Sequence, residues 1–90
     1  MKYRFKTTPS FRKALGKLTT GQKKSARQAF AIFKADPFDP RLRTHKIHGL
    51  SVRFGRTIYS VWVEADLRAV FYLDGEIVVS VDVGAHSIYR

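Results

Sequence analysis

The sequence contains no cysteine, no long apolar run and, within its first 35 residues, no acidic residue. Without cysteine, neither a disulfide framework nor thiolate chemistry is available. No apolar run reaches the roughly 18 residues that a membrane-spanning helix needs, and the N-terminal residues lack the apolar region of a signal peptide. These absences predict a cytoplasmic protein with no membrane partner.

Positive charge is abundant and unevenly distributed. The chain has 17 Lys and Arg residues against seven Asp and Glu, a net charge of +10. Residues 1–35 hold ten of the basic residues, whereas residues 36–90 hold seven basic and seven acidic residues. The N-terminal part therefore supplies the whole net charge, which favours a polyanion or a strongly acidic protein as partner. A merely solvated basic surface is the alternative.

The first half of the chain predicts a strand followed by two helices. The 90 residues indicate one domain, 1–90. Alternating polar and apolar residues over 2–6 are typical of a half-buried strand. Thr8 and Pro9 then mark the start of a short helix, and Thr19 with Gln22 forms a capping-box pattern for a second one. Asp36, which precedes a proline, ends that helix.

These two helices are expected to form a basic helical hairpin. Apolar residues recur at helical spacing on one face of each helix: Phe11, Ala14, Leu15 and Leu18, then Ala26, Ala29, Phe30 and Phe33. The polar faces carry Lys13, Lys17, Lys23, Lys24, Arg27 and Lys34. The predicted hairpin thus has one face for a core and one for an anionic partner.

The second half predicts a sheet. Residues 36–43 read as a loop, and residues 51–56, with Arg53 and Arg56, as a short strand or a loop. Three apolar runs follow, separated by turn signals at 65–66 and 74–75, which indicates an antiparallel meander. The predicted class is α+β, in the order β-α-α-β-β-β: an antiparallel twisted sheet with the basic helical hairpin packed on one face.

The register of the last hairpin affects the site. A two-residue turn at Asp74 and Gly75 would place Arg68 opposite Val81 and leave His86 on the other face. A longer turn would change this pairing, and so would a β-bulge at Gly84, which we expect.

Several residues have the chemistry for metal-free RNA cleavage. That reaction needs a base for the 2′-hydroxyl, positive charge near the phosphate and an acid for the leaving oxygen. Arg68, His86 and Tyr89 supply these groups, and His45, Lys46 and His48 are further candidates. Each also has a purely structural interpretation, such as pairing of Arg68 with Glu64 or Asp66. No third ligand accompanies the two neighbouring histidines, so neither a metal nor another cofactor is expected.

The order of these elements resembles the RelE/ParE superfamily, the toxins of type II toxin–antitoxin systems. The matching landmarks cover nearly the whole chain: Asp36-Pro37; His45-Lys46-Ile47-His48-Gly49; Tyr59 to Val63 leading into Asp66-Leu67-Arg68; and Val83-Gly84-Ala85-His86 with Tyr89. The RelE-like branch implies an endoribonuclease that cleaves mRNA, usually in the A site of the 30S ribosomal subunit, and that a cognate antitoxin holds inactive. DNA contact is then expected only through the antitoxin.

The resemblance also implies roles for individual residues. Arg68 matches the phosphate-contacting arginine, His86 a catalytic histidine or arginine, Tyr89 a base-aligning aromatic residue, and His45 the catalytic histidine of some members. Lysines on the preceding strand of RelE are replaced by Ser60 and Trp62, so histidine is expected to carry more of the proton transfer. The residues expected to bind RNA are Lys46, His48, Arg53, Arg56, Lys13, Lys17, Lys23, Lys24 and Arg27.

Two other functions remain open at this point. The ParE-like branch implies a DNA gyrase inhibitor without nuclease activity. A catalytically weakened relative would persist as a module that binds an antitoxin or nucleic acid.

Overall fold

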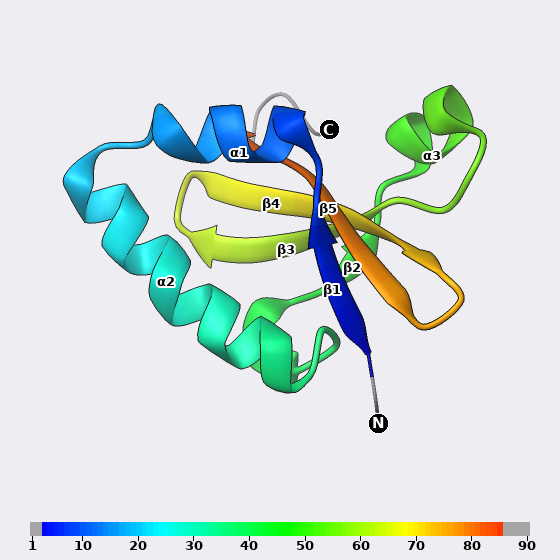
Figure 1. The fold of residues 1–90 in the computed structure, drawn as a ribbon, viewed down its shortest axis with the longest axis horizontal. Coiled ribbons are helices and arrows are strands. Elements are labelled where there is room, and N and C mark those ends of the chain that lie inside the picture. Colours follow the sequence, from blue (N-terminus) through cyan, green and yellow to red (C-terminus); the bar gives the residue numbers. More distant parts are fainter. Residues whose placement is uncertain (1–2, 86–90) are drawn as a thin grey trace.

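A computed structural model describes residues 3–85 of the 90-residue chain. In chain order its elements are β1 (Arg4–Thr7), α1 (Pro9–Gly16), α2 (Thr20–Ala35), the 3-10 turn η1 (Pro40–Leu42), β2 (His45–Lys46), α3 (His48–Phe54), β3 (Tyr59–Glu64), β4 (Leu67–Asp74) and β5 (Ile77–Ala85). The strands form one sheet in the order β1-β5-β4-β3-β2. The predicted α+β class is confirmed (Figure 1).

Helices α1 and α2 begin where the sequence predicts, and α2 also ends there, whereas α1 ends at Gly16, before Leu18. The Thr8 hydroxyl accepts a hydrogen bond from the Phe11 amide at 3.1 Å, and Pro9 occupies the first turn of α1. At the start of α2, the Thr19 hydroxyl accepts from the Gln22 amide while the Gln22 side chain accepts from the Thr19 amide. This reciprocal pair satisfies two of the amides that a helix leaves without partners. Helix α2 ends at Ala35, directly before Asp36.

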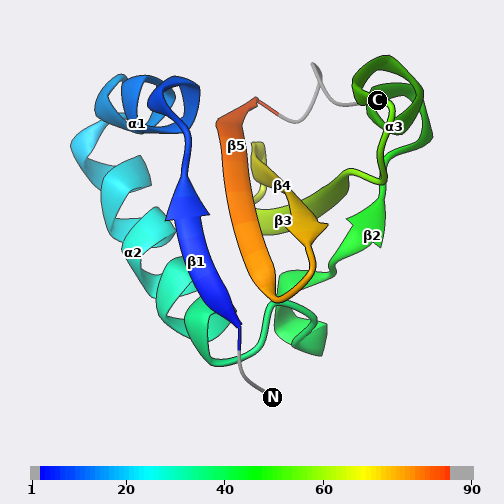
Figure 2. The same ribbon diagram turned by 45° about the vertical axis from the view of Figure 1, so that its right-hand side comes forward.

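The helical hairpin covers one face of the sheet (Figure 2). Phe11 of α1 and Phe33 of α2 are buried against strand residues such as Phe71, and the Phe33 and Phe71 rings meet edge to face at 5.0 Å between centroids. Edge-to-face pairs of this kind are favoured because ring edges carry positive and ring faces negative charge. This main core leaves the opposite face of β3, β4 and β5 free to carry polar residues.

The sheet is mixed, which corrects the expectation of a purely antiparallel sheet. Strands β2, β3, β4 and β5 pair antiparallel, but β1 pairs parallel with β5, Arg4 opposite Ile77. The hairpin α1–α2 separates β1 in sequence from the meander and allows β1 to join its edge in either direction. Local patterns along β1 carry no information about that direction.

The predicted register of the last hairpin is wrong. The two loop residues are Gly75 and Glu76, since Asp74 pairs with Ile77. Gly75 has φ +61, and glycine is favoured at the first loop position of a type II′ turn. A β-bulge is present, as expected, but it lies where the pairing shifts between Val70 and Phe71 rather than at Gly84.

Helix α3 corrects the interpretation of residues 51–56 as a strand or loop. Ser51 joins α3 to β3, because its hydroxyl donates to the Ile47 carbonyl at 2.7 Å and accepts from the Ile58 amide at 2.9 Å. Gly55 ends the helix with φ +68, a conformation that glycine adopts without steric cost. A second, smaller core of Ile47, Ile58 and Val70 lies beneath it. Within residues 3–85, no helix has the length and apolar character to span a membrane.

Candidate functional site

The face of the sheet opposite the helical hairpin carries a row of cationic and aromatic side chains. Trp62 on β3 pairs directly with Arg68 on β4, which in turn pairs with Gly84 on β5. Directly paired residues of neighbouring strands point to the same face. On the other side of Trp62, the Arg43 guanidinium carbon lies 5.2 Å from the ring centroid. We call Arg43, Trp62 and Arg68 the arginine row.

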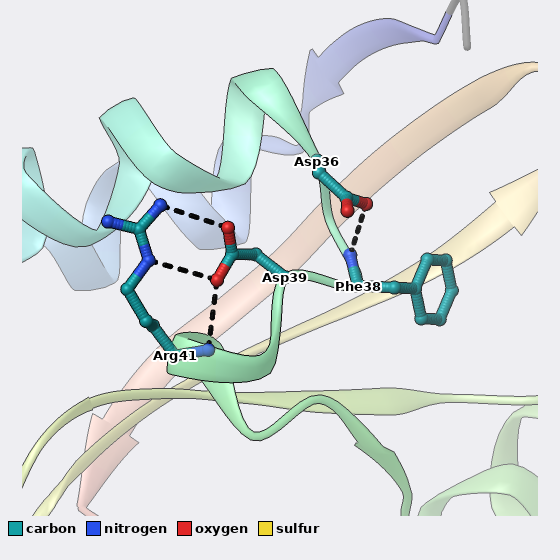
Figure 3. Close-up of polar contacts among 4 residues, drawn as sticks. All are labelled: Asp36, Phe38, Asp39 and Arg41. Carbon is teal, nitrogen blue, oxygen red and sulfur yellow. Dashed lines mark hydrogen bonds and ion pairs between the residues drawn. The ribbon is translucent and has the colours of Figure 1, made fainter.

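A tightly bonded loop places Arg43. The Asp36 carboxylate accepts from the Phe38 amide at 2.9 Å, and the Asp39 carboxylate accepts from the Arg41 amide at 2.9 Å (Figure 3). The Arg41 guanidinium returns to both Asp39 oxygens at 3.0 and 2.9 Å. These bonds close the η1 turn, and buried Leu42 holds it to the core.

Arg43 itself has an unusual backbone conformation. Its φ is +50 and its ψ +40, the left-handed region, and it is the one non-glycine residue with positive φ within residues 3–85. For a residue with a β-carbon this conformation costs roughly 1–2 kcal/mol. Such strain persists where surrounding contacts enforce it, and it is frequent at functional sites. Here it directs the Arg43 side chain over Trp62.

Backbone carbonyls hold Arg68. Its Nη1 donates to the carbonyls of Glu64 at 2.7 Å and Leu67 at 3.2 Å, at the turn between β3 and β4. Within residues 3–85 the one ion pair joins Arg41 to Asp39. The structural alternative that pairs Arg68 with Glu64 or Asp66 therefore has no support in that part of the chain.

The surroundings of the Arg68 guanidinium favour the binding of an anion. Partial burial lowers the pKa of Arg68 below its usual value, repulsion from nearby Arg43 lowers it further, and Asp66 acts in the opposite direction. A guanidinium remains charged at neutral pH despite such a shift. Neither guanidinium has a carboxylate ion-pair partner among residues 3–85. Two mutually repelling groups of this kind gain most when an anion binds between them, and a phosphate matches the geometry of a guanidinium.

His45 lies on the same face, one row further along the sheet. It pairs with Ser60, two residues before Trp62 on β3. The His45 Nδ1 is 2.8 Å from the Arg43 carbonyl. A carbonyl only accepts, so Nδ1 carries the proton and Nε2 keeps its lone pair in the neutral ring. An exposed Nε2 next to the arginine row can accept a proton from a bound substrate.

The other predicted residues are distributed over the molecule. Lys46 pairs with Tyr59 and points to the face opposite His45. His48 and Arg53 are exposed on α3, and the Arg56 guanidinium lies 4.2 Å from the Tyr72 ring centroid. The basic residues of the hairpin lie on α1 and α2, except Lys17, which follows the end of α1; these helices cover the other face. His86 and Tyr89 lie outside the described residues.

Arg43 is the site residue that sequence reasoning missed. It falls in a segment interpreted as a loop, and nothing in its type distinguishes it from Arg41 two residues earlier. The available signal was Asp39 followed by Pro40, a capping residue and a proline at the first helical position. That pattern predicts a helical turn whose end fixes the direction of Arg43.

An apolar groove lies on the helical side, between β1, α1 and α2. It has a volume of about 650 Å³, and its apolar walls include Phe5, Phe11, Leu15 and Phe30. Lys6, Arg27 and Lys34 border it. The outer edge of β1, the last strand of the sheet, is adjacent. Because a sheet edge exposes unpaired backbone groups, it is suited to a partner segment.

Comparison with solved structures defines the fold class as that of RelE-like toxins. The toxin of the archaeal RelE–RelB complex from Pyrococcus horikoshii superposes with a TM-score of 0.71 at 18% identity, over 94% of this chain and 96% of the other. The RelBE2 toxin–antitoxin complex from Mycobacterium tuberculosis gives 0.70 at 19% identity, over 96% and 100%. The Escherichia coli DinJ–YafQ complex gives 0.64 at 13% identity, over 98% and 97%.

Because these sequence identities are low, the comparisons show similarity of fold alone. Models of known protein families do not match the chain, and a search of curated protein sequences finds no significant relative. The predicted RelE-like architecture is confirmed over nearly the full chain length.

Proposed function

We propose that this protein is the toxin of a type II toxin–antitoxin system and that it cleaves mRNA as a metal-independent endoribonuclease acting on the ribosome. The observation that carries the proposal is the arginine row, in which Arg43 and Arg68 flank Trp62 on the face away from the helical hairpin. RNA cleavage makes a phosphorane with more negative charge than the starting phosphodiester. Groups already fixed near that charge stabilise the transition state more than the ground state.

The arrangement supports distinct roles for its side chains. Arg68, held by carbonyls of the β3–β4 turn, contacts the non-bridging oxygens of the phosphate. Arg43 supplies a second positive charge from the other side of Trp62, and the half-buried Trp62 ring offers an aromatic surface for a nucleotide. His45 Nε2 takes the proton of the 2′-hydroxyl. His86 remains the predicted acid for the departing 5′-oxygen, and Tyr89 the predicted base-aligning residue.

The basic helical hairpin serves binding rather than chemistry in this proposal. Its lysines lie on the side of the molecule opposite the arginine row and attract the phosphate backbone of ribosomal RNA without base specificity. The substrate phosphate then lies on one face of the sheet while the ribosome contacts the other.

The proposed partner is an acidic amphipathic antitoxin segment in the groove beside β1. The solved complexes from Pyrococcus horikoshii and Mycobacterium tuberculosis hold RelE-type toxins with antitoxins. The groove of this chain combines phenylalanine walls with Lys6, Arg27 and Lys34 at its border. Apolar side chains of the segment would fill the groove and its carboxylates would face those cations.

Primer extension after induced expression tests the nuclease proposal. New 5′ ends within translated mRNA are expected in cells that express the wild-type chain and not in cells that express Arg68→Ala. A supercoiling assay with DNA gyrase and purified protein is run in parallel. Inhibition of gyrase with intact mRNA would contradict the nuclease proposal and support a ParE-like gyrase inhibitor instead.

A further inference from the structure

A second groove lies on the same face of the sheet as the arginine row. It has a volume of about 390 Å³ and lies between α3 and the start of α1, which are at the upper edge of the molecule in Figure 1. Val70, Val81 and Asp82 form its floor, and Arg53 and Phe54 of α3 form one wall. The functional roles proposed above for the arginine row and His45 do not involve this groove.

Phe54 gives the groove an aromatic wall that the fold does not need. Its side chain is 51% exposed, although α3 has a small core beneath it in which Ile47, Ile58 and Val70 are buried. A phenylalanine that stabilised this core would be buried with them. An exposed aromatic ring next to a cationic side chain, here Arg53, is the arrangement on which nucleobases stack.

Asp82 gives the same groove an acceptor. It pairs with Val70 and is therefore the diagonal neighbour of Arg68, roughly 7–8 Å away between α-carbons. Its Oδ1 accepts from the Val83 amide at 2.9 Å, and within residues 3–85 no hydrogen bond or ion pair occupies Oδ2. An ionised carboxylate only accepts, so Oδ2 is available to an N–H donor of a ligand.

We propose that this groove is a nucleobase subsite selective for guanine, adjacent to the phosphate bound at the arginine row. Guanine presents two neighbouring donors, N1–H and the 2-amino group, on its Watson–Crick edge. Adenine, cytosine and uracil each present an acceptor beside their donor, which a carboxylate repels. The base would stack on Phe54 and donate to Asp82 while its phosphate contacts Arg68. The phosphate position rests on the proposed function, and the base preference does not.

Titration with two nucleotides tests the preference without requiring cleavage. Guanosine and inosine monophosphates differ only in the 2-amino group, so the ratio of their affinities isolates its contact. We expect the wild-type chain to bind the guanosine nucleotide on the order of tenfold more tightly, since a hydrogen bond to a charged group discriminates on that scale. Amide shifts in nuclear magnetic resonance spectra give both affinities and the location.

Three variants complete the experiment. Asp82→Asn keeps the Oδ1 that caps Val83 and should reduce the guanosine preference to within about twofold. Asp74→Asn, the same change at the exposed end of β4 outside the groove, should retain the full preference. Phe54→Leu should lower the affinity for both nucleotides by at least about fivefold. The ratio of the two affinities should not change, because stacking does not distinguish the two bases.

The outcomes separate this inference from the proposed reaction. Equal wild-type affinities, or a preference that survives in Asp82→Asn, would overturn the guanine subsite even if the protein cleaves RNA. A preference that depends on Asp82 would support the subsite even if no mRNA cleavage is found, and the nuclease proposal alone would then be wrong.

Discussion

The guanidinium of Arg43 lies over the ring of Trp62, 5.2 Å from its centroid, while Arg68 pairs with Trp62 across the neighbouring strand. Two cationic side chains from segments 25 residues apart in the sequence thus approach one indole. Neither arginine belongs to a hydrophobic core. The positive charge of each lowers the free-energy cost of placing an anion beside the other. The five predictions below follow from this arrangement and from the surfaces around it.

Arg43→Gly should lower activity while leaving the free energy of unfolding nearly unchanged. Glycine relieves the left-handed strain at position 43 and removes the stacking on Trp62, two effects of opposite sign and similar size. We expect the free energy of unfolding to change by no more than about 1 kcal/mol. Activity should fall together with the lost charge. Urea unfolding and a cleavage assay measure the two effects.

Arg43→Lys is the matched control for that experiment. It keeps the charge and the β-carbon but loses the planar stacking and the bidentate geometry of the guanidinium. Activity between that of the wild type and Arg43→Gly is expected. A fully active glycine variant would show that Arg43 is not part of the site.

The Asp39 carboxyl, in the loop that precedes Arg43, has a lowered pKa that can be measured. Hydrogen bonds and charge from Arg41 lower the pKa of the Asp39 carboxyl from 3.8 to about 2. In Arg41→Ala, carbon-detected magnetic resonance titration should show this pKa rising toward 3.8. Because the folded-state pKa is the lower one, the stabilisation is present above about pH 4 and is lost as pH falls through about 2. An unchanged Asp39 pKa would contradict the bonds of Figure 3.

Charge reversal on the helical hairpin should weaken RNA binding without disturbing the fold. Lys13, Lys17, Lys23 and Lys24 are changed together to Glu. The logarithm of the binding constant then depends less steeply on the logarithm of salt concentration, because fewer counterions are released. Filter binding to ribosomes at several salt concentrations measures the slope, and an unchanged slope would exclude this surface.

Two charge reversals test the apolar groove beside β1 as the proposed antitoxin site. Arg27→Glu with Lys34→Glu places two carboxylates at the border of the groove, where an acidic partner segment is proposed to bind. Affinity for a co-expressed antitoxin should fall at least about tenfold, through repulsion and lost attraction. Calorimetry measures the affinity, and Arg56→Glu on the other face serves as the control.

The sequence predicts the helical part of this fold well because its signals are local. Caps at Thr8 and Thr19 and the break at Asp36 depend on neighbours within three residues, so patterns alone locate α1 and α2. Helix α3 was missed because Ser51 to Phe54 alternate like a strand, and the helix depends on contacts of Ser51 with Ile47 and Ile58. The parallel pairing of β1 with β5 joins the two ends of the chain, which no local pattern encodes.

The candidate site could be predicted in composition but not in arrangement. Arg68 stood out because it interrupts an apolar strand pattern, and His45 because it lies in a cluster with Lys46 and His48. Arg43 did not, since its importance comes from a backbone φ of +50 that only the closed η1 turn imposes. The one-residue difference in the β4–β5 turn and the bulge after Val70 together placed Arg68 opposite Gly84 instead of Val81.

The single-turnover cleavage rate of ribosome-bound mRNA tests the arginine row most directly. Arg68→Ala and Arg43→Ala should each lower the rate by on the order of 10²–10³, the usual effect of removing one group that stabilises transition-state charge. The double variant should be little slower than the poorer single variant, because groups that act in one step are not additive. His86→Gln, measured in parallel, reports whether histidine acid–base chemistry contributes. Near wild-type rates in both alanine variants would contradict the assignment of this face as the site of cleavage.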